Sequence, residues 1–263
     1  MENARYKTAI IKIGTDVCTT CEGRLDEQII ENLVGQIMIV KKEIEQVLLV
    51  TSGAVAEGRA EHEETKRHDE DIDTKGMFAS CGQPILMDLY RQYLKKLHDC
   101  IAYQFLVTKE IFSSRERSQT LLRRLDKISN SKKAGLPIFN ENDAIADEEI
   151  MFTDNDELAA LLAGTVKAEI VVLLTGVDGV QKDVHDKGTL ISEIGIAEQE
   201  EYRKYIVSGT SGNGKGGMDS KYDIACKLAK QGIQVHIANG RTLNVLKRII
   251  LKEERIGTVF TPF

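Results

Sequence analysis

Six short runs of apolar and β-branched residues constrain the fold of this chain more than any other feature. The runs are TAIIKIG (8–14), VLLVTSG (47–53), IAYQFLVT (101–108), LPIFNEN (136–142), EIVVLLTG (169–176) and QVHIANG (234–240). None of them alternates polar with apolar residues. Each run is therefore predicted to be a strand that is buried on both faces of a sheet.

Amphipathic segments lie between these runs. In residues 25–43, apolar side chains recur at helical spacing, and residues 86–97 and 157–168 show the same pattern. Strands that alternate with helices indicate an α/β fold, with a mostly parallel open sheet covered on both faces. We find no internal repeat or low-complexity linker in the 263 residues, which favours one domain made of two lobes.

Charge and cysteine content narrow the class of protein. The net charge is −6 and no basic block stands out, so we do not expect a nucleic-acid partner. The chain begins without the features of a signal peptide, and its longest apolar runs are too short to span a bilayer. We therefore expect a cytoplasmic protein without a membrane partner, in which the five cysteines are reduced. Cys18 and Cys21 form a C-x-x-C; two incidental loop thiols are favoured over a metal or redox site.

Polar and glycine residues directly follow four of the predicted strands. They are residues 12–15, 51–54, 140–143 and 175–179. The carboxyl ends of parallel strands meet at one edge of a sheet, and ligands of such sheets bind beyond that edge. The sequence therefore predicts a site there.

A glycine-rich segment, SGTSGNGKGG (208–217), precedes a further amphipathic run. Gly209–Lys215 matches the start of a P-loop, but Gly216 stands where the magnesium-binding Ser or Thr is required. The glycines also match a dinucleotide-binding triplet. That interpretation requires an acidic residue at the end of the next strand, which instead ends in Asn239. Both interpretations are disfavoured.

In a third interpretation, the segment binds a phosphate group. The glycine backbone allows the phosphate to approach closely, and a helix that begins near Gly217 directs its positive end at it. Lys221 lies one turn into that helix and is able to reach back over the phosphate. The segment by itself fits an ordinary surface loop equally well. Lys12 favours the phosphate-binding interpretation, because a lysine at a buried strand end is costly without an anionic partner. Two lysines around one phosphate suit phosphoryl transfer.

Two further segments have no clear place in the sheet. Residues 61–75 are almost wholly charged, and a solvated loop or exposed helix is favoured over a mobile lid. Residues 181–195 are predicted to form a hairpin or an excursion between sheet elements.

The motifs together resemble the amino acid kinase family over nearly the whole chain, from about Ala9 to GTVF (257–260). They occur in the family's order: IIKIGTDV (10–17), LVTSGAVAEG (49–58), IFNENDAI (138–145), TDNDELAALLAG (153–164), LLTGVDGV (173–180), GKGGMDSK (214–221) and ANGR (238–241). TSGAVA, NENDA and DNDELAALLA are similar to the members that phosphorylate the γ-carboxylate of L-glutamate, the first step of proline biosynthesis.

The resemblance implies a role for each matching residue. Lys12 and Lys221 would stabilise the transferring phosphoryl group, and Asp156 would orient both lysines. Gly14 and Gly53 would donate backbone N–H groups near the phosphoryl and acceptor groups. The implied glutamate-binding residues are Ser52, Gly53, Asn140, Asp143, Asp154 and Asn155, with Asn142 close by. The implied ATP-binding residues are Lys12, Gly14, Thr175, Gly176, Lys215, Gly216, Gly217, Met218 and Lys221.

The resemblance also implies an αβα sandwich with an acceptor-binding lobe at roughly 1–165 and an ATP-binding lobe at roughly 166–263. The cofactors would be ATP and Mg²⁺, the metal bridging the phosphates with few protein ligands. A homo-oligomer, a dimer or tetramer, and feedback inhibition by proline are further expectations. Many bacterial members carry a C-terminal PUA domain, which we expect this chain to lack because it stops at Phe263.

The residue chemistry agrees with a carboxylate acceptor, which is ionised at neutral pH and requires no general base. His98 and His236 are interpreted as core or helix residues. Acidic and amide side chains suit the ammonium and carboxylates of glutamate, although each alone equally forms turns or caps, and Asp154 in particular could cap the helix that follows it.

Four features depart from the family pattern. Lys215 replaces a threonine, Gly176 an aspartate and Asp16 a serine or threonine, and the charged segment 61–75 replaces a more apolar one. Two alternatives therefore stay open. One is a sibling kinase that acts on N-acetylglutamate, aspartate or another acid. The other is a non-catalytic nucleotide or amino-acid sensor.

Overall fold

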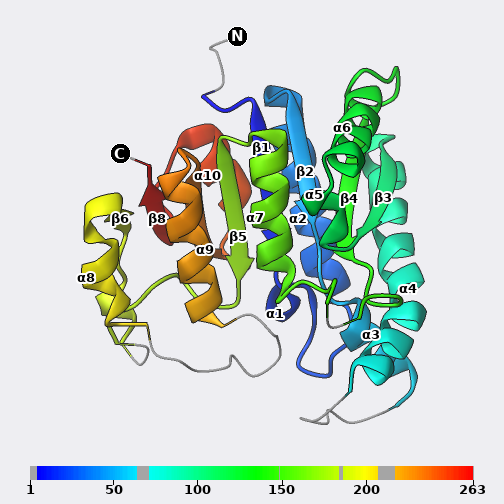
Figure 1. Cartoon of the computed structure of the whole chain (residues 1–263), viewed down its shortest axis with the longest axis horizontal. Helices are drawn as coiled ribbons and strands as arrows, with labels where there is room; N and C mark the ends of the chain where they lie inside the picture. Colours follow the sequence, from blue (N-terminus) through cyan, green and yellow to red (C-terminus); the bar gives the residue numbers. More distant parts are fainter. Residues whose placement is uncertain (1–4, 64–70, 148, 184–185, 207–216, 263) are drawn as a thin grey trace.

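A computed structural model describes residues 5–63, 71–147, 149–183, 186–206 and 217–262 (Figure 1). Within these residues, eight strands form one sheet in the order β3-β4-β2-β1-β5-β7-β8-β6. Neighbouring strands run parallel except β7 and β8, which are antiparallel. The expected α/β fold with a mostly parallel open sheet is confirmed.

All six predicted strands are present. They are β1 (Thr8–Ile13), β2 (Gln46–Val50), β3 (Ile101–Val107), β4 (Gly135–Glu141), β5 (Ile170–Thr175) and β7 (Gln234–Asn239). The structure adds two short strands, β6 (Glu193–Gly195) and β8 (Thr258–Thr261). In the segment 181–195, which was predicted to be a hairpin or an excursion, an antiparallel bridge joins Gln181 to Leu190 and β6 occupies the last three residues.

The prediction that every strand is buried on both faces is wrong for β3. This strand lies at one edge of the sheet and pairs with β4. Ile101 and Leu106 are 39% and 38% exposed, whereas all seven residues of β4 are buried. A continuous apolar run therefore does not distinguish an edge strand from a central one in this chain.

The helices are α1 (Thr15–Cys18), α2 (Glu27–Glu43), α3 (Ala54–Glu61), α4 (Ile72–His98), α5 (Glu110–Ser113), α6 (Arg115–Ser129), α7 (Asn155–Val166), α8 (Gln199–Arg203), α9 (Met218–Lys230) and α10 (Val245–Lys252). Short 3₁₀ turns occupy Lys187–Thr189 and Ile196–Glu198. The three predicted helical segments lie in α2, α4 and α7. Among the described residues, no helix is long and apolar enough to cross a membrane.

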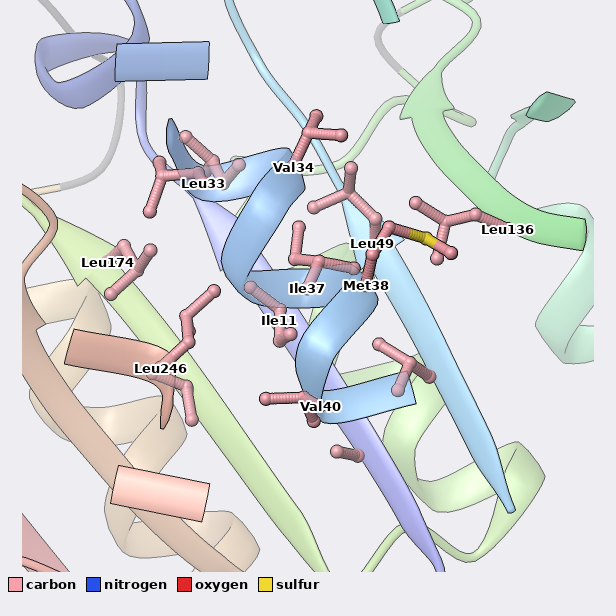
Figure 2. Packing of buried hydrophobic residues seen from close by; sticks show 14 of the residues in the cluster. Ile11, Leu33, Val34, Ile37, Met38, Val40, Leu49, Leu136, Leu174 and Leu246 are labelled. Atoms are coloured by element: carbon pink, nitrogen blue, oxygen red, sulfur yellow. The ribbon is translucent and has the colours of Figure 1, made fainter. Parts of the chain in front are cut away.

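Helices cover both faces of the sheet, so the strands have buried side chains on each side. Residues of α2, α4 and α10 pack against one face, and residues of α6, α7 and α9 pack against the other. Figure 2 shows Ile37 of α2 beside Ile11 of β1, with Leu246 of α10 nearby. Full burial of each such side chain is worth roughly 1.5–3 kcal/mol.

The charged segment 61–75 is only partly described, because residues 64–70 lie outside the described part of the chain. Its first residue, Glu61, ends α3, and its last four residues, 72–75, begin α4. Asp71 caps α4 by accepting a hydrogen bond of 2.7 Å from the amide of Thr74. The charged residues at both ends of the segment thus belong to helix ends.

The carboxyl ends of the parallel strands lie along the lower edge of the sheet in Figure 1, beside α1 and α3. The polar strand ends noted in the sequence meet at this edge because β4, β2, β1 and β5 are consecutive neighbours. The fold thus places the predicted site where ligands of such sheets bind.

Candidate active site

The centre of the site is a buried carboxylate between two lysines. The Asp156 Oδ1 atom lies 2.9 Å from Lys12 Nζ, and its Oδ2 atom lies 3.0 Å from Lys221 Nζ. The carboxylate is fully buried, and the lysine side chains are 7% and 8% exposed. Residues from β1, α7 and α9 therefore meet at one point, as the sequence predicted for the two lysines.

Opposing effects act on the charge of Asp156. Burial by itself raises its pKa, but the ammonium groups of Lys12 and Lys221 outweigh that effect and hold the pKa below its ordinary value. The carboxylate is therefore ionised at neutral pH. The cluster of two cations and one anion carries one net positive charge in a site shielded from water, where an anion is attracted strongly.

Asp154 fixes the start of α7. Its Oδ1 atom accepts hydrogen bonds of 2.9 Å from the amides of Asp156 and Glu157, so the predicted helix cap is confirmed. Its Oδ2 atom accepts a hydrogen bond of 2.7 Å from the hydroxyl of Ser220, the residue before Lys221. Both oxygens of Asp154 therefore have protein partners, and they hold the starts of α7 and α9 together.

Beside the charged centre, three of the predicted acceptor residues form one hydrogen-bond network. Asn155 Nδ2 donates to Asn140 Oδ1 at 2.9 Å, to Ser52 Oγ at 3.1 Å and to the Thr51 carbonyl at 3.0 Å. Asn140 Nδ2 donates to Gln83 Oε1 at 2.8 Å. Strand ends of β2 and β4 are thereby linked to the first residue of α7.

Two atoms of this network lack a partner in the part of the protein that the structure describes. Gln83 Nε2 and Asn155 Oδ1 are buried and have no hydrogen-bond partner among the described residues. Such atoms are uncommon in folded proteins, and each one calls for an explanation. An unpaired donor and an unpaired acceptor at one site suit a ligand that has both an anionic and a cationic group, such as an amino acid.

Gln83 was missed from the sequence, because it lies in the middle of α4 without a motif around it. The one local signal is its neighbour Gly82. A Cβ atom at this position would come within 1.9 Å of the Ala54 carbonyl. Glycine is required there because α4 crosses the start of α3 very closely, and this crossing brings Gln83 to Asn140.

Gly53 connects β2 to α3 and requires a glycine. Its φ of +105° lies in the left-handed region. A Cβ atom would also come within 3.1 Å of Cys18 Sγ and of Leu25 Cδ2. Asp143, another predicted acceptor residue, is half-buried in the loop after β4, where its carbonyl faces Gly76 of α4.

The expected donor role of Gly14 is not supported. Its N–H group donates to the Leu174 carbonyl at 3.0 Å, which continues the pairing of β1 with β5. The position of Gly14 nevertheless lies at the charged centre, since a Cβ atom there would be 3.7 Å from Lys12 Nζ.

The predicted nucleotide residues are described in part. Thr175 is buried at the end of β5, and Gly176 follows it in the exposed turn. Gly217 is the N-cap of α9 and Met218 its first residue, whereas Lys215 and Gly216 lie outside the described residues. A Cβ atom on Gly176 would lie 3.4 Å from the Cβ atom of Asp16, so two of the unusual positions are neighbours.

Both members of the C-x-x-C have free thiols. Cys18 is buried, and its Sγ donates to the Ser52 carbonyl at 3.3 Å. Burial raises the pKa of the Cys18 thiol to about 12. Cys21 is exposed, and the described residues contain no group of three or more His, Cys, Asp or Glu side chains that could hold a metal ion.

A parallel sheet with two buried lysines on one carboxylate at its carboxyl edge defines a protein of the phosphotransferase class. A sequence model of the amino acid kinase family matches residues 7–239. This chain belongs to the amino acid kinase family.

Similar proteins agree with this assignment. The chain is 37% identical to a glutamate 5-kinase of Chlorobaculum tepidum, over 93% of this chain and 66% of that protein. It is 36% identical to a glutamate 5-kinase of Caldanaerobacter subterraneus subsp. tengcongensis, over 96% of this chain and 67% of that protein. The chain thus spans about two thirds of the length of these relatives.

The fold also matches solved structures. The UMP kinase from Bacillus anthracis superposes with a TM-score of 0.63 at 15% sequence identity, over 98% of this chain and 96% of that one. This similarity supports the fold.

Proposed function

We propose that this protein is a glutamate 5-kinase, which transfers the γ-phosphoryl group of ATP to the γ-carboxylate of L-glutamate. The products would be γ-glutamyl phosphate and ADP, in the first step of proline biosynthesis. The observation that carries this proposal is the buried Lys12–Asp156–Lys221 cluster beside the network of Ser52, Asn140 and Asn155. The similarity to two glutamate 5-kinases supports the acceptor.

The charged cluster would act on the transferring group. A γ-carboxylate oxygen of glutamate would attack the γ-phosphorus while the bond to the ADP oxygen breaks. Negative charge on the phosphoryl oxygens would be stabilised by the ammonium groups of Lys12 and Lys221. Asp156 would keep both ammonium groups in fixed positions, so little reorganisation is required during the reaction.

The network beside the cluster would bind the acceptor. The free Gln83 Nε2 donor suits a carboxylate of glutamate, and the free Asn155 Oδ1 acceptor suits its ammonium group. Because the attacking carboxylate is already ionised, the reaction requires no general base. Gly53 and Asp143 would complete the acceptor side, whereas Asp154 would act through the start of α7.

The nucleotide would bind between β5 and α9, with Thr175, Gly176, Gly217 and Met218 near it. Lys215 and Gly216 are part of the same proposal. Mg²⁺ would arrive with ATP and neutralise charge on its phosphates. This arrangement would divide the chain into an acceptor lobe at roughly 1–165 and an ATP lobe at roughly 166–263.

Three further proposals come from the family resemblance alone. They are a cytoplasmic location, a homo-oligomeric state (dimer or tetramer) and feedback inhibition by proline. Sedimentation of the purified chain tests the oligomer, and titration of the kinase reaction with proline tests the inhibition.

The acceptor is tested by supplying ATP and Mg²⁺ with glutamate, N-acetylglutamate or aspartate in turn, and by trapping any acyl phosphate with hydroxylamine. We expect hydroxamate and ADP with glutamate alone. Formation of product with another acid would support phosphoryl transfer but would contradict glutamate as the acceptor. Absence of product with all three acids, together with measurable ATP binding, would favour a sensor.

A further inference from the structure

A cavity lies at the amino-terminal edge of the sheet, opposite the candidate active site. Its volume is about 620 Å³, and it lies between the carboxyl ends of α2, α4 and α6 and the start of β4. Five lysines and one histidine line it: Lys41, Lys42, Lys95, Lys96, Lys133 and His98. We call this the basic cavity.

In the described part of the chain, the lysines of the basic cavity have no ion-pair partners. Among the described residues, none of the five forms an ion pair with a carboxylate. Asp99 is the one carboxylate that lines the cavity. This concentration of unpaired positive charge stands out in a chain whose net charge is −6.

Lysines are often found at the carboxyl ends of helices, where they offset the helix dipole. That role accounts for only part of the charge here. Three helix ends carry roughly half a negative charge each. Together with Asp99, they offset about half of the five positive charges, which leaves a net positive cavity.

His98 also lines the basic cavity. It is the last residue of α4, and its Nε2 atom is buried without a hydrogen-bond partner among the described residues. Lys41 is also partly buried, and this burial lowers its pKa. Lys41 is thus partly withdrawn from water at the cavity wall, so an anionic ligand that pairs with it would replace lost hydration.

We propose that the basic cavity binds a small polyanion that carries two or more phosphate groups. Phosphates suit lysines, which act as compact point charges, and the cavity volume is within the range of small-molecule sites. Strands of six or seven residues separate this edge from the active-site edge, a distance of roughly 20 Å. The ligand would therefore bind together with ATP and glutamate.

The test is calorimetric titration of the full chain with inorganic triphosphate, in the presence of a saturating non-hydrolysable ATP analogue. The analogue occupies the nucleotide site, so binding reports on a second site. We expect one bound triphosphate per chain and an affinity that falls as salt is raised. The double variant Lys41→Gln/Lys95→Gln should weaken binding by about tenfold or more, because two of five positive charges are removed.

Two controls separate this site from others. Lys247→Gln/Lys252→Gln on α10 removes the same charge elsewhere and should leave triphosphate affinity unchanged. Lys12→Ala alters the active site and should also leave it unchanged. In the wild-type chain, the ring signals of His98 in NMR spectra, assigned with His98→Asn, should shift on titration.

Absence of binding, or equal affinity in the Lys41→Gln/Lys95→Gln variant, would overturn the proposal. Loss of binding in Lys12→Ala would assign the triphosphate to the active site and would also overturn it. Because the readout is binding rather than turnover, the result does not depend on the identity of the acceptor.

Discussion

Lys12 and Asp156 form an ion pair of 2.9 Å, although the lysine side chain is 7% exposed and the carboxylate is fully buried. A buried ion pair of this kind is weak evidence for stability, because desolvation offsets much of the attraction. The ion pair instead holds the Lys12 ammonium group in a fixed place. The second lysine on the same carboxylate, Lys221, extends this arrangement to α9.

Replacement of Asp156 with Asn tests this arrangement. The variant removes the carboxylate that pairs with both buried ammonium groups, so we expect a loss of about 3–5 kcal/mol in the free energy of unfolding. We also expect a fall of about 100-fold or more in kcat. Urea titration and the hydroxamate assay measure the two effects. Asp126→Asn, at an exposed site on α6, is the control, and near-normal turnover of Asp156→Asn would contradict the prediction.

Gln83→Leu tests the acceptor network. The change removes Gln83 Oε1, which accepts a hydrogen bond from the Asn140 side-chain amide. It also removes Gln83 Nε2, the donor proposed to bind glutamate. Loss of a buried hydrogen-bond partner costs about 1–3 kcal/mol, so we expect KM for glutamate to rise about tenfold or more while KM for ATP changes little. Gln92→Leu, at an exposed position on the same helix, is the control. Equal effects on both KM values would argue for a general structural role of Gln83.

Two glycine-to-alanine changes should have opposite effects on stability. Gly53→Ala places a Cβ at a φ of +105° and within 3.1 Å of two side-chain atoms, so we expect destabilisation by more than about 1 kcal/mol. Gly35 lies inside α2 with nothing within 4 Å of its Cβ position. Gly35→Ala should therefore stabilise the protein by about 0.5–1 kcal/mol. Chemical denaturation measures both, and equal signs would refute the explanation.

Because the His236 side chain is buried, we expect the stability of the protein to depend on pH. Burial lowers its pKa to about 4, below the ordinary 6.5. As pH falls below about 6.5, the unfolded chain binds a proton that the folded chain does not bind until about pH 4, so stability falls across this window. The loss amounts to about 3 kcal/mol at most. His236→Gln should flatten this part of the stability curve, whereas His62→Gln, at an exposed histidine, should not. An unchanged slope in His236→Gln would contradict the prediction.

The strands and the main helices were predictable because their apolar patterns reflect the local rule that buried faces are apolar. The exposure of β3 was not predictable, since its run is as apolar as those of the central strands and only the strand order places it at an edge. The short strands β6 and β8 have too few residues for a pattern. Their pairing depends on contacts that are distant in sequence.

The site was predictable where a residue belongs to a motif at a strand end or helix start, as Lys12, Asp156 and Lys221 do. Gln83 has no such context, and it reaches Asn140 because glycines allow α3 and α4 to cross closely. The motif around Gly14 likewise does not show that its N–H group pairs with the Leu174 carbonyl of β5. The hydrogen-bond partners of both residues depend on tertiary contacts, which the local sequence does not indicate.

In the proposed reaction, Lys12 and Lys221 stabilise the transferring phosphoryl group. The most direct measurement is the rate of glutamyl hydroxamate formation by Lys12→Met and Lys221→Met under saturating ATP and glutamate. Lys109→Met is the matched control, because Lys109 also pairs with a carboxylate of α7, Glu157 at 3.0 Å, but is partly exposed. We predict a fall of about 100-fold or more in kcat for each of the first two variants and a change of less than about threefold for the control. Folded Lys12→Met and Lys221→Met proteins with near-normal kcat would contradict the account.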